Sequence, residues 1–168
     1  MAKTYEPIAT TTAPGGTSTI TFSSISGAYT DLVLVGGNIG YVAASNTPFL
    51  RINGDTATNY SGTVISGNGT SAQSTRRTSS SAGIPLGGTY VGSSTTVATN
   101  FILQLMNYSN TTTYKTGLSR YFQSAGEVEA TVGLWRNTAA ITSIEYRTDG
   151  AGVISAGAVF TLYGIKSA

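Results

Sequence analysis

Residues 128–135 form the stretch Val-Glu-Ala-Thr-Val-Gly-Leu-Trp, in which apolar side chains recur at every second position. Successive side chains of an extended chain point to opposite sides, so Val128, Ala130, Val132 and Leu134 share one face and Trp135 lies on the other. This alternation is typical of a β-strand with one face on a hydrophobic core. We therefore predict a strand that turns its valine and leucine side chains inward and Trp135 outward.

The same period of two extends along most of the chain. Tyr114, Leu118 and Phe122, for example, share one face of a predicted strand, and turn sequences such as Asn53-Gly54-Asp55 separate the segments. No stretch of ten residues has a helical repeat. The predicted strands are residues 4–10, 17–23, 31–39, 48–53, 60–66, 72–80, 97–107, 113–124, 127–137, 141–148 and 158–166. We predict one domain, residues 1–168, that folds as an all-β, single jelly-roll-like antiparallel β-sandwich.

Two segments are apolar on both sides of the predicted strand: Leu32–Val35 and Phe101–Met106. Both faces of such a strand need cover. One interpretation is a central strand buried between a sheet and loops, and the other is a strand whose second face meets another subunit. The sequence leaves both open.

The composition excludes several classes of protein. Charged residues make up 10% of the chain, against about 25% in an average domain, and cysteine is absent. Neither a disulfide framework nor a thiolate metal site can form. The net charge of +2 does not predict nucleic-acid binding, and the adjacent pair Arg76-Arg77 fits a solvated edge or turn better than a phosphate site. Neither a secretion signal nor a membrane span is predicted.

The chain contains no histidine, which removes the commonest general base and metal ligand. Glu127 and Glu129 are two positions apart, as two acids of a glycosidase could be, but the solvent-facing side of an ordinary strand explains them better. Asp55 and Asp149 follow or begin turn sequences, where local hydrogen bonding explains them better than calcium does. We therefore predict neither an enzyme nor a bound cofactor or metal.

Residues 1–12 are predicted as a contact arm or an edge strand, because a polar terminal strand with Pro7 can pair at a sheet edge. Exposed aromatic side chains can anchor a protein interface or stack on a sugar ring. The candidate contact residues are Lys3, Tyr5, Pro7, Arg76, Arg77, Trp135 and Tyr163. For each aromatic residue, packing in the core is the alternative.

Several motifs together resemble a group of small virion structural proteins of tailed bacteriophages. They are Ile20–Ile25 with Tyr29–Leu34, Ile52–Asp55 with Asn59–Ser61, Gly133–Ile141, and Phe160–Lys166, and they cover nearly the whole chain. The resemblance implies a homotrimeric β-sandwich that decorates a capsid or forms a fibre tip, with no catalytic residues. It also implies a turn at Asn53-Gly54-Asp55 and packing or subunit-contact roles for Trp135 and Tyr163.

The leading hypothesis is a capsid decoration protein on the outer surface of the virion. It would form a homotrimer, bind the major capsid protein and stabilise the shell by preferring the assembled lattice. No long attachment or stalk region precedes the motifs, which favours this role over a fibre. The alternative is a receptor-binding or glycan-binding module at a tail or fibre tip, with a host glycan as its partner.

Overall fold

The computed structural model describes residues 4–42, 47–87, 97–122, 126–148 and 152–166. Every regular element in these residues is a β-strand, and all of the strand pairs are antiparallel. The prediction of an all-β antiparallel sandwich is confirmed. The jelly-roll arrangement stays a prediction.

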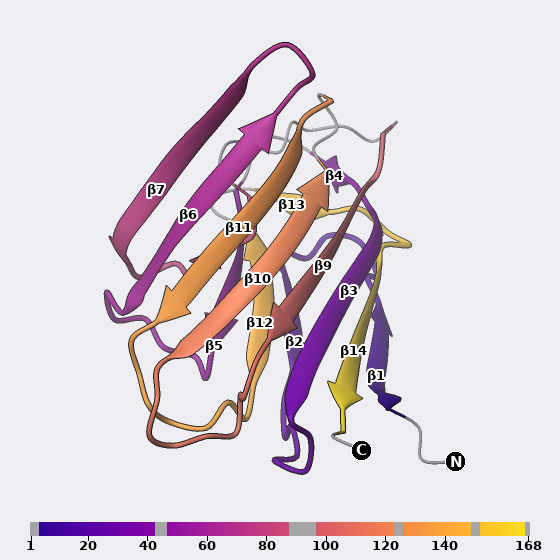
Figure 1. Ribbon diagram of the computed structural model, residues 1–168. Helices are drawn as coiled ribbons and strands as arrows, with labels where there is room; N and C mark the ends of the chain where they lie inside the picture. The colour runs from indigo at the N-terminus through magenta and orange to yellow at the C-terminus, as the bar shows by residue number, and fades with distance from the viewer. Residues whose placement is uncertain (1–3, 43–46, 88–96, 123–125, 149–151, 167–168) are drawn as a thin grey trace.

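An eight-stranded sheet forms one layer of the molecule (Figure 1). In spatial order its strands are β1 (Tyr5–Thr12), β14 (Val159–Ile165), β3 (Asp31–Ile39), β9 (Thr99–Leu105), β10 (Lys115–Phe122), β11 (Val128–Trp135), β6 (Tyr60–Gly67) and β7 (Ala72–Ser80). Residues 1–12 were predicted as either a contact arm or an edge strand, and within them β1 is an edge strand of this sheet.

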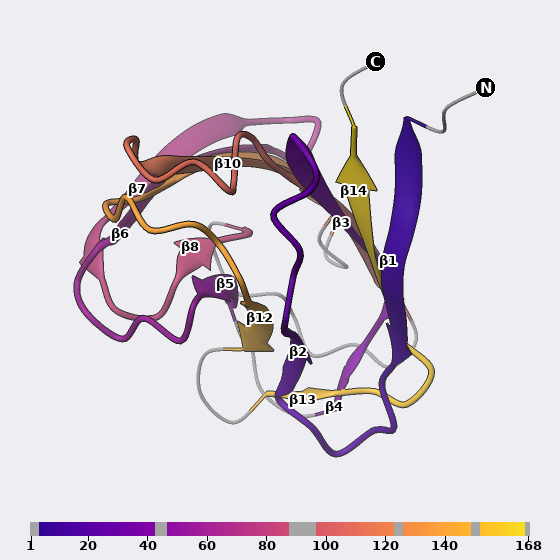
Figure 2. The same ribbon diagram turned by 90° about the horizontal axis from the view of Figure 1, so that it is seen from below.

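The second layer is smaller, and the large sheet curves over it (Figure 2). Its four strands are, in spatial order, β2 (Thr19–Phe22), β12 (Ile144–Thr148), β5 (Pro48–Ile52) and β8 (Ile84–Pro85). A further pair, β13 (Val153–Ile154) with β4 (Tyr41–Val42), lies at one end. All eleven predicted strands have a counterpart in the structure, while the two-residue strands β4, β8 and β13 are too short to show a period in the sequence.

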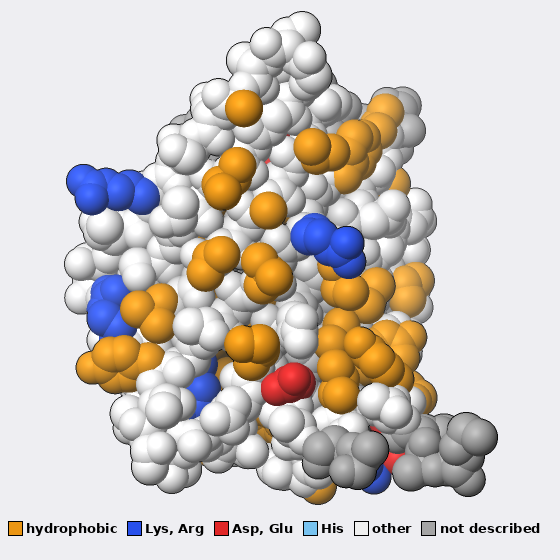
Figure 3. All heavy atoms as spheres, viewed as in Figure 1, with side chains coloured by type: hydrophobic (Ala, Val, Ile, Leu, Met, Phe, Trp, Pro, Cys, Tyr) orange, Lys and Arg blue, Asp and Glu red, His pale blue; other side chains and the backbone are white. Residues whose placement is uncertain are grey.

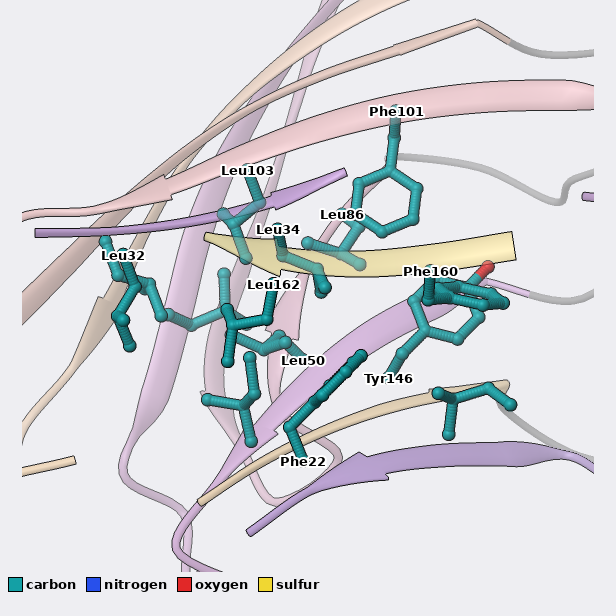
Figure 4. Close-up of a cluster of buried hydrophobic side chains, with 14 of the residues drawn as sticks. Phe22, Leu32, Leu34, Leu50, Leu86, Phe101, Leu103, Tyr146, Phe160 and Leu162 are labelled. Atoms are coloured by element: carbon teal, nitrogen blue, oxygen red, sulfur yellow. The ribbon is translucent and has the colours of Figure 1, made fainter. Parts of the chain in front are cut away.

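The hydrophobic core lies between the two layers and draws side chains from both (Figure 4). At its centre the rings of Phe101 and Tyr146 stack with centroids 5.4 Å apart, and Phe160 packs against Tyr146 at 4.8 Å. Such ring pairs add about 0.5–1.5 kcal/mol to the free energy of area burial. Around them lie Phe22, Leu32, Leu34, Leu50, Leu86, Leu103 and Leu162. The core therefore ties the N-terminal strands to the C-terminal strand β14.

A row of three glycines crosses the inner face of the large sheet. Gly62, Gly133 and Gly117 lie directly opposite one another on β6, β11 and β10. A Cβ atom on Gly133 would lie 2.1 Å from Cγ2 of Ile84, and one on Gly62 would lie 2.7 Å from Cγ of Pro85. Strand β8 therefore sits directly on the backbone of the sheet, in a trough that only glycine leaves open.

The predicted orientation of residues 128–135 is wrong. Glu129, Thr131, Gly133 and Trp135 face the core, and Val128, Ala130, Val132 and Leu134 face outward. The physical reason is the close approach of β8, which leaves no room for a Cβ atom at Gly133, while Trp135, two positions along the same face, packs on Tyr60 in the core. Alternation correctly predicted the strand, but it could not say which of its two faces is covered.

Trp135 is a second correction, because its side chain is 1% exposed and cannot act as a surface contact. Its indole stacks on Tyr60, and Nε1 donates a hydrogen bond of 2.7 Å to Oδ2 of Asp55. The same oxygen accepts a hydrogen bond from Asn59 at 2.8 Å. Partial burial raises the pKa of Asp55, but the hydrogen bonds from Asn59, Trp135 and the Ala57 amide outweigh it and lower that pKa.

Buried tyrosine hydroxyl groups form the polar part of the core. The hydroxyls of Tyr41 and Tyr146 bond to each other, and that of Tyr121 lies 3.2 Å from Oγ1 of Thr99. The Tyr60 hydroxyl donates to the Ile52 carbonyl at 3.2 Å. Burial raises the pKa of all four tyrosines, that of Tyr60 to about 12.

We predict that Gly133→Ala lowers the free energy of unfolding by about 1–3 kcal/mol, because the new methyl group overlaps Ile84. Urea unfolding followed by tryptophan fluorescence measures the change. The matched control is Gly27→Ala, where a Cβ atom would lie at an ordinary 3.6 Å from Ser109. Ile84→Ala should recover part of the loss in the double variant, and an additive double variant would contradict the overlap.

We predict that the fold loses stability from about pH 10 upward, the ordinary pKa of tyrosine. Because the folded-state pKa of Tyr60 is raised to about 12, the unfolded chain releases its proton first, and stability falls as the pH rises through that range. Urea unfolding at stepped pH measures the slope. Tyr60→Phe should make the slope shallower between pH 10 and 12, whereas Tyr5→Phe, at an exposed position, should leave it unchanged.

Candidate functional site

The outer face of the large sheet is rich in exposed apolar side chains on the strands β6, β11 and β10. Leu118 is 50% exposed, Val132 58%, Ile65 61% and Val128 63%. On the same strands the inward side chains include Ser119 and Thr131, each 1% exposed. At these positions the strands depart from the usual arrangement, in which polar side chains meet the solvent and apolar ones the core. The aromatic side chains of Tyr60, Tyr121 and Trp135 on the same strands do face the core.

The inward polar side chains have structural partners. The Ser119 hydroxyl donates to the Leu86 carbonyl at 3.1 Å, and the Thr131 hydroxyl donates to the same oxygen at 3.4 Å. On β9, the Thr99 hydroxyl donates to the Ile39 carbonyl at 3.1 Å. The hydroxyls of Ser119 and Thr131 thus hold the covering segment, Ile84–Leu86, against the sheet and satisfy the Leu86 carbonyl.

Paired residues of antiparallel strands lie on the same face, so the register shows which side chains are neighbours. One row of outward residues crosses the sheet from edge to edge: Pro7, Tyr163, Val33, Gln104, Leu118, Val132, Thr63 and Arg76. Three predicted contact residues, Pro7, Tyr163 and Arg76, thus belong to one surface. A fourth, Tyr5, lies on it beside Ile165 and is 57% exposed.

Figure 3 shows this face in full, with hydrophobic side chains spread over the sheet and few charged ones among them. Part of it is hollowed into a groove of about 820 Å³ across β6, β11, β10 and β9. Ile65, Ile102, Phe122 and Val128 line the groove together with Arg120. The groove is therefore an apolar concave surface with Arg120 set into it.

The charged groups of this face have few partners within the described part of the chain. Arg120 forms no ion pair there. Asp31 lies at the start of β3, beside Ile165 in the register, and its Oδ1 accepts a hydrogen bond from the Asn107 amide at 2.8 Å. The side chains of Arg120 and Asp31 thus sit on the same surface, on strands separated by β9.

The remaining basic candidates differ from one another. Arg76 is exposed and faces outward, but Arg77 faces the other side of β7 and is half-buried. Its guanidinium lies 5.2 Å from the centroid of the Phe49 ring and donates to Thr47 Oγ1 at 3.3 Å. Arg77 therefore braces the edge strand against the small sheet. Lys3 lies outside the described residues.

The solvent-facing pair of acids at Glu127 and Glu129 does not form. Strand β11 begins at Val128, so Glu127 precedes it, and Glu129 faces inward with 5% exposure. A Cβ atom on Gly87 would lie 2.5 Å from Oε2 of Glu129, which places that carboxylate beneath the segment that covers the sheet. The glycosidase comparison required both carboxylates on one exposed face of a strand. The structure does not place Glu127 and Glu129 in this way.

Asn53-Gly54-Asp55 forms the predicted turn. Asn53 and Gly54 have φ angles of 51° and 65°, and the Asp55 amide donates to the Ile52 carbonyl at 2.9 Å. The Asp55 carboxylate is used by Trp135, Asn59 and Ala57. Asp149 lies outside the described residues. Within the residues the structure describes, no group of three or more acidic, histidine or cysteine side chains could hold a metal ion.

The exposure of the outer face of β6, β11 and β10 was not predicted from the sequence. A signal was present, because Gly117 and Ser119 alternate with Leu118 and Arg120, and Thr131 and Gly133 alternate with Val132. Small residues at every second position mark a strand on which another backbone lies closely. The covering segment Ile84–Leu86 is too short to be recognised in the sequence by its pattern.

The described residues contain no helix with the length and apolarity needed to cross a membrane. A scan against protein-family models, a search of curated proteins and a search of solved structures each gave no match for this chain.

Proposed function

We propose that this chain is a virion structural protein that decorates the outer surface of a tailed-bacteriophage capsid. Its partners would be the major capsid protein and further copies of itself in a homotrimer. The resemblance of its motifs to small phage virion proteins supports the proposal, as does a composition with 10% charged residues.

The observation that carries the proposal is the apolar outer face of the large sheet. Isolated apolar side chains are normal on a protein surface, but a continuous apolar patch marks an interaction site. Here the patch is formed by outward side chains of three adjacent strands, among them Leu118, Val132 and Ile65, each at least 50% exposed. A surface of this kind suits a protein that works by lasting association with other proteins.

Decoration stabilises a capsid by mass action. A protein that binds the assembled lattice and not the free subunits shifts the equilibrium towards the lattice. At about 100 times the dissociation constant, the gain is about 2.7 kcal/mol per site. Many copies bound at repeated sites therefore strengthen the shell without any chemical step.

The alternative is a receptor-binding or glycan-binding module at a tail or fibre tip. The exposure of Tyr5 and Tyr114, at 57% and 55%, favours it, because exposed aromatic rings can stack on sugars. Trp135, a candidate contact residue in the sequence, is buried and cannot stack on a sugar ring. Decoration accounts for the apolar face, which the alternative leaves unexplained.

We predict that the purified chain binds capsids that lack it, saturates at hundreds of copies per particle, and raises the temperature at which they break open. Quantitative gel analysis of sedimented particles gives the copy number, and scanning calorimetry gives the temperature. Unassembled capsid protein is the control and should not bind. Native virions that carry only a handful of copies, with binding of the chain to host cells, would instead support the tail-tip alternative.

A further inference from the structure

We infer that the outer face of the large sheet is buried between copies of this chain. One part, the Arg120 half, consists of the outward side chains of β6, β11 and β10 around Arg120. The other, the Asp31 half, consists of those of β1, β14 and β3 around Asp31. The Arg120 half of one copy packs on the Asp31 half of the next. This inference rests on the proposed function insofar as a decoration protein acts as an oligomer.

The size of the face fits one side of a stable protein interface. Strands lie about 4.8 Å apart and rise about 3.3 Å per residue, so eight strands of about eight residues cover about 1,000 Å². One partner in a standard interface contributes about 800 Å², so the face is large enough. The row of outward positions from Pro7 to Val132 crosses both halves, with exposed apolar side chains at Leu118 and Val132. Both halves can therefore be buried together.

The charges of the two halves are complementary. Burying Arg120 in an apolar contact without a carboxylate would be strongly unfavourable. Most other described acids are engaged within the chain: Glu6 with Lys166, Glu145 with Arg51 and Arg147, and Asp55 with Trp135. Asp31 lies on the outer face and accepts one hydrogen bond from a backbone amide. Among the described acids it is the one that this surface presents to a neighbour.

Arg120 and Asp31 cannot meet within one copy. In the register Arg120 lies opposite Ile102, which lies opposite Val35, four residues along β3 from Asp31. Two strand spacings and four residues amount to about 16 Å between their backbones. An ion pair between them therefore forms only between copies. A head-to-tail contact of unlike halves forms a ring where the rotation between successive copies closes and a filament where it does not.

The shapes of the two halves also correspond. The groove around Arg120 holds about 820 Å³ and is lined by Ile65, Phe122 and Val128. The Asp31 half carries two outward tyrosines, Tyr5 and Tyr163. Tyrosine side chains that fill an apolar pocket are typical anchors of protein interfaces, and a ring placed beside Arg120 would add a cation–π contact.

The test is the mass of the full chain in solution, by native mass spectrometry and light scattering. We expect the unmodified chain to be an oligomer and Leu118→Asp and Val132→Asp to be monomers with unchanged circular dichroism. Val42→Asp is the matched control, since Val42 is 50% exposed but lies on β4, away from this face. A monomeric unmodified chain, or Asp variants that keep the oligomer mass, would overturn the inference.

A charge exchange tests the pairing of the halves. Arg120→Asp alone and Asp31→Arg alone should each weaken association by at least about tenfold, the effect of about 1.4 kcal/mol. The double variant should recover most of the loss, and a double variant as weak as the sum of the single ones would overturn the pairing. Capsid binding is measured separately. An oligomer that binds no capsid refutes only the proposed function, and a monomer that decorates capsids refutes only this inference.

Discussion

The contact of strand β8 with the glycine row of the large sheet is the constraint on which the rest of the structure depends. Gly133 and Gly62 allow Ile84 and Pro85 to lie on the sheet backbone, where a methyl group on either glycine would overlap them. Gly117 continues the row, and small hydroxyl residues occupy inner positions beside it. Ser119 and Thr131 then bond to the Leu86 carbonyl and hold the covering segment in place.

The same constraint explains the outer face. On the inner face of β10 and β11 the positions nearest β8 hold glycine or small hydroxyl residues, while the large side chains of Tyr121 and Trp135 lie farther along the same face. Leucine and valine therefore occupy the outward positions, for example Leu118 opposite Val132. A surface that results in this way is apolar over several adjacent strands, and its burial between proteins recovers about 25 cal/mol for each Å² removed from water. The interior packing and the proposed association thus have one cause.

The sequence was sufficient to predict the strands but not their orientation. Period two and turn chemistry placed β11, β10 and β6 within a few residues of their observed bounds. Which face of a strand is covered depends on residues far away in the chain, here Ile84 and Pro85, and local alternation contains no such information. For this reason the sequence left Trp135 between a surface contact and the core, and the structure places it in the core. Pro7 and Tyr163 are neighbours in the register of the large sheet, and their contact role stays a prediction.

The edges of the large sheet favour association through its face and oppose association through strand pairing. An open edge strand can pair with another chain, and natural sheets block this with proline, bulges and charges. On β1 the register shifts between Pro7 and Ala9, and Pro7 lacks an amide donor. On β7 the register shifts opposite Tyr60 and Gly62, and the strand carries Arg76 and Arg77. With both edges guarded, we expect copies to associate through the apolar face and not by pairing of edge strands.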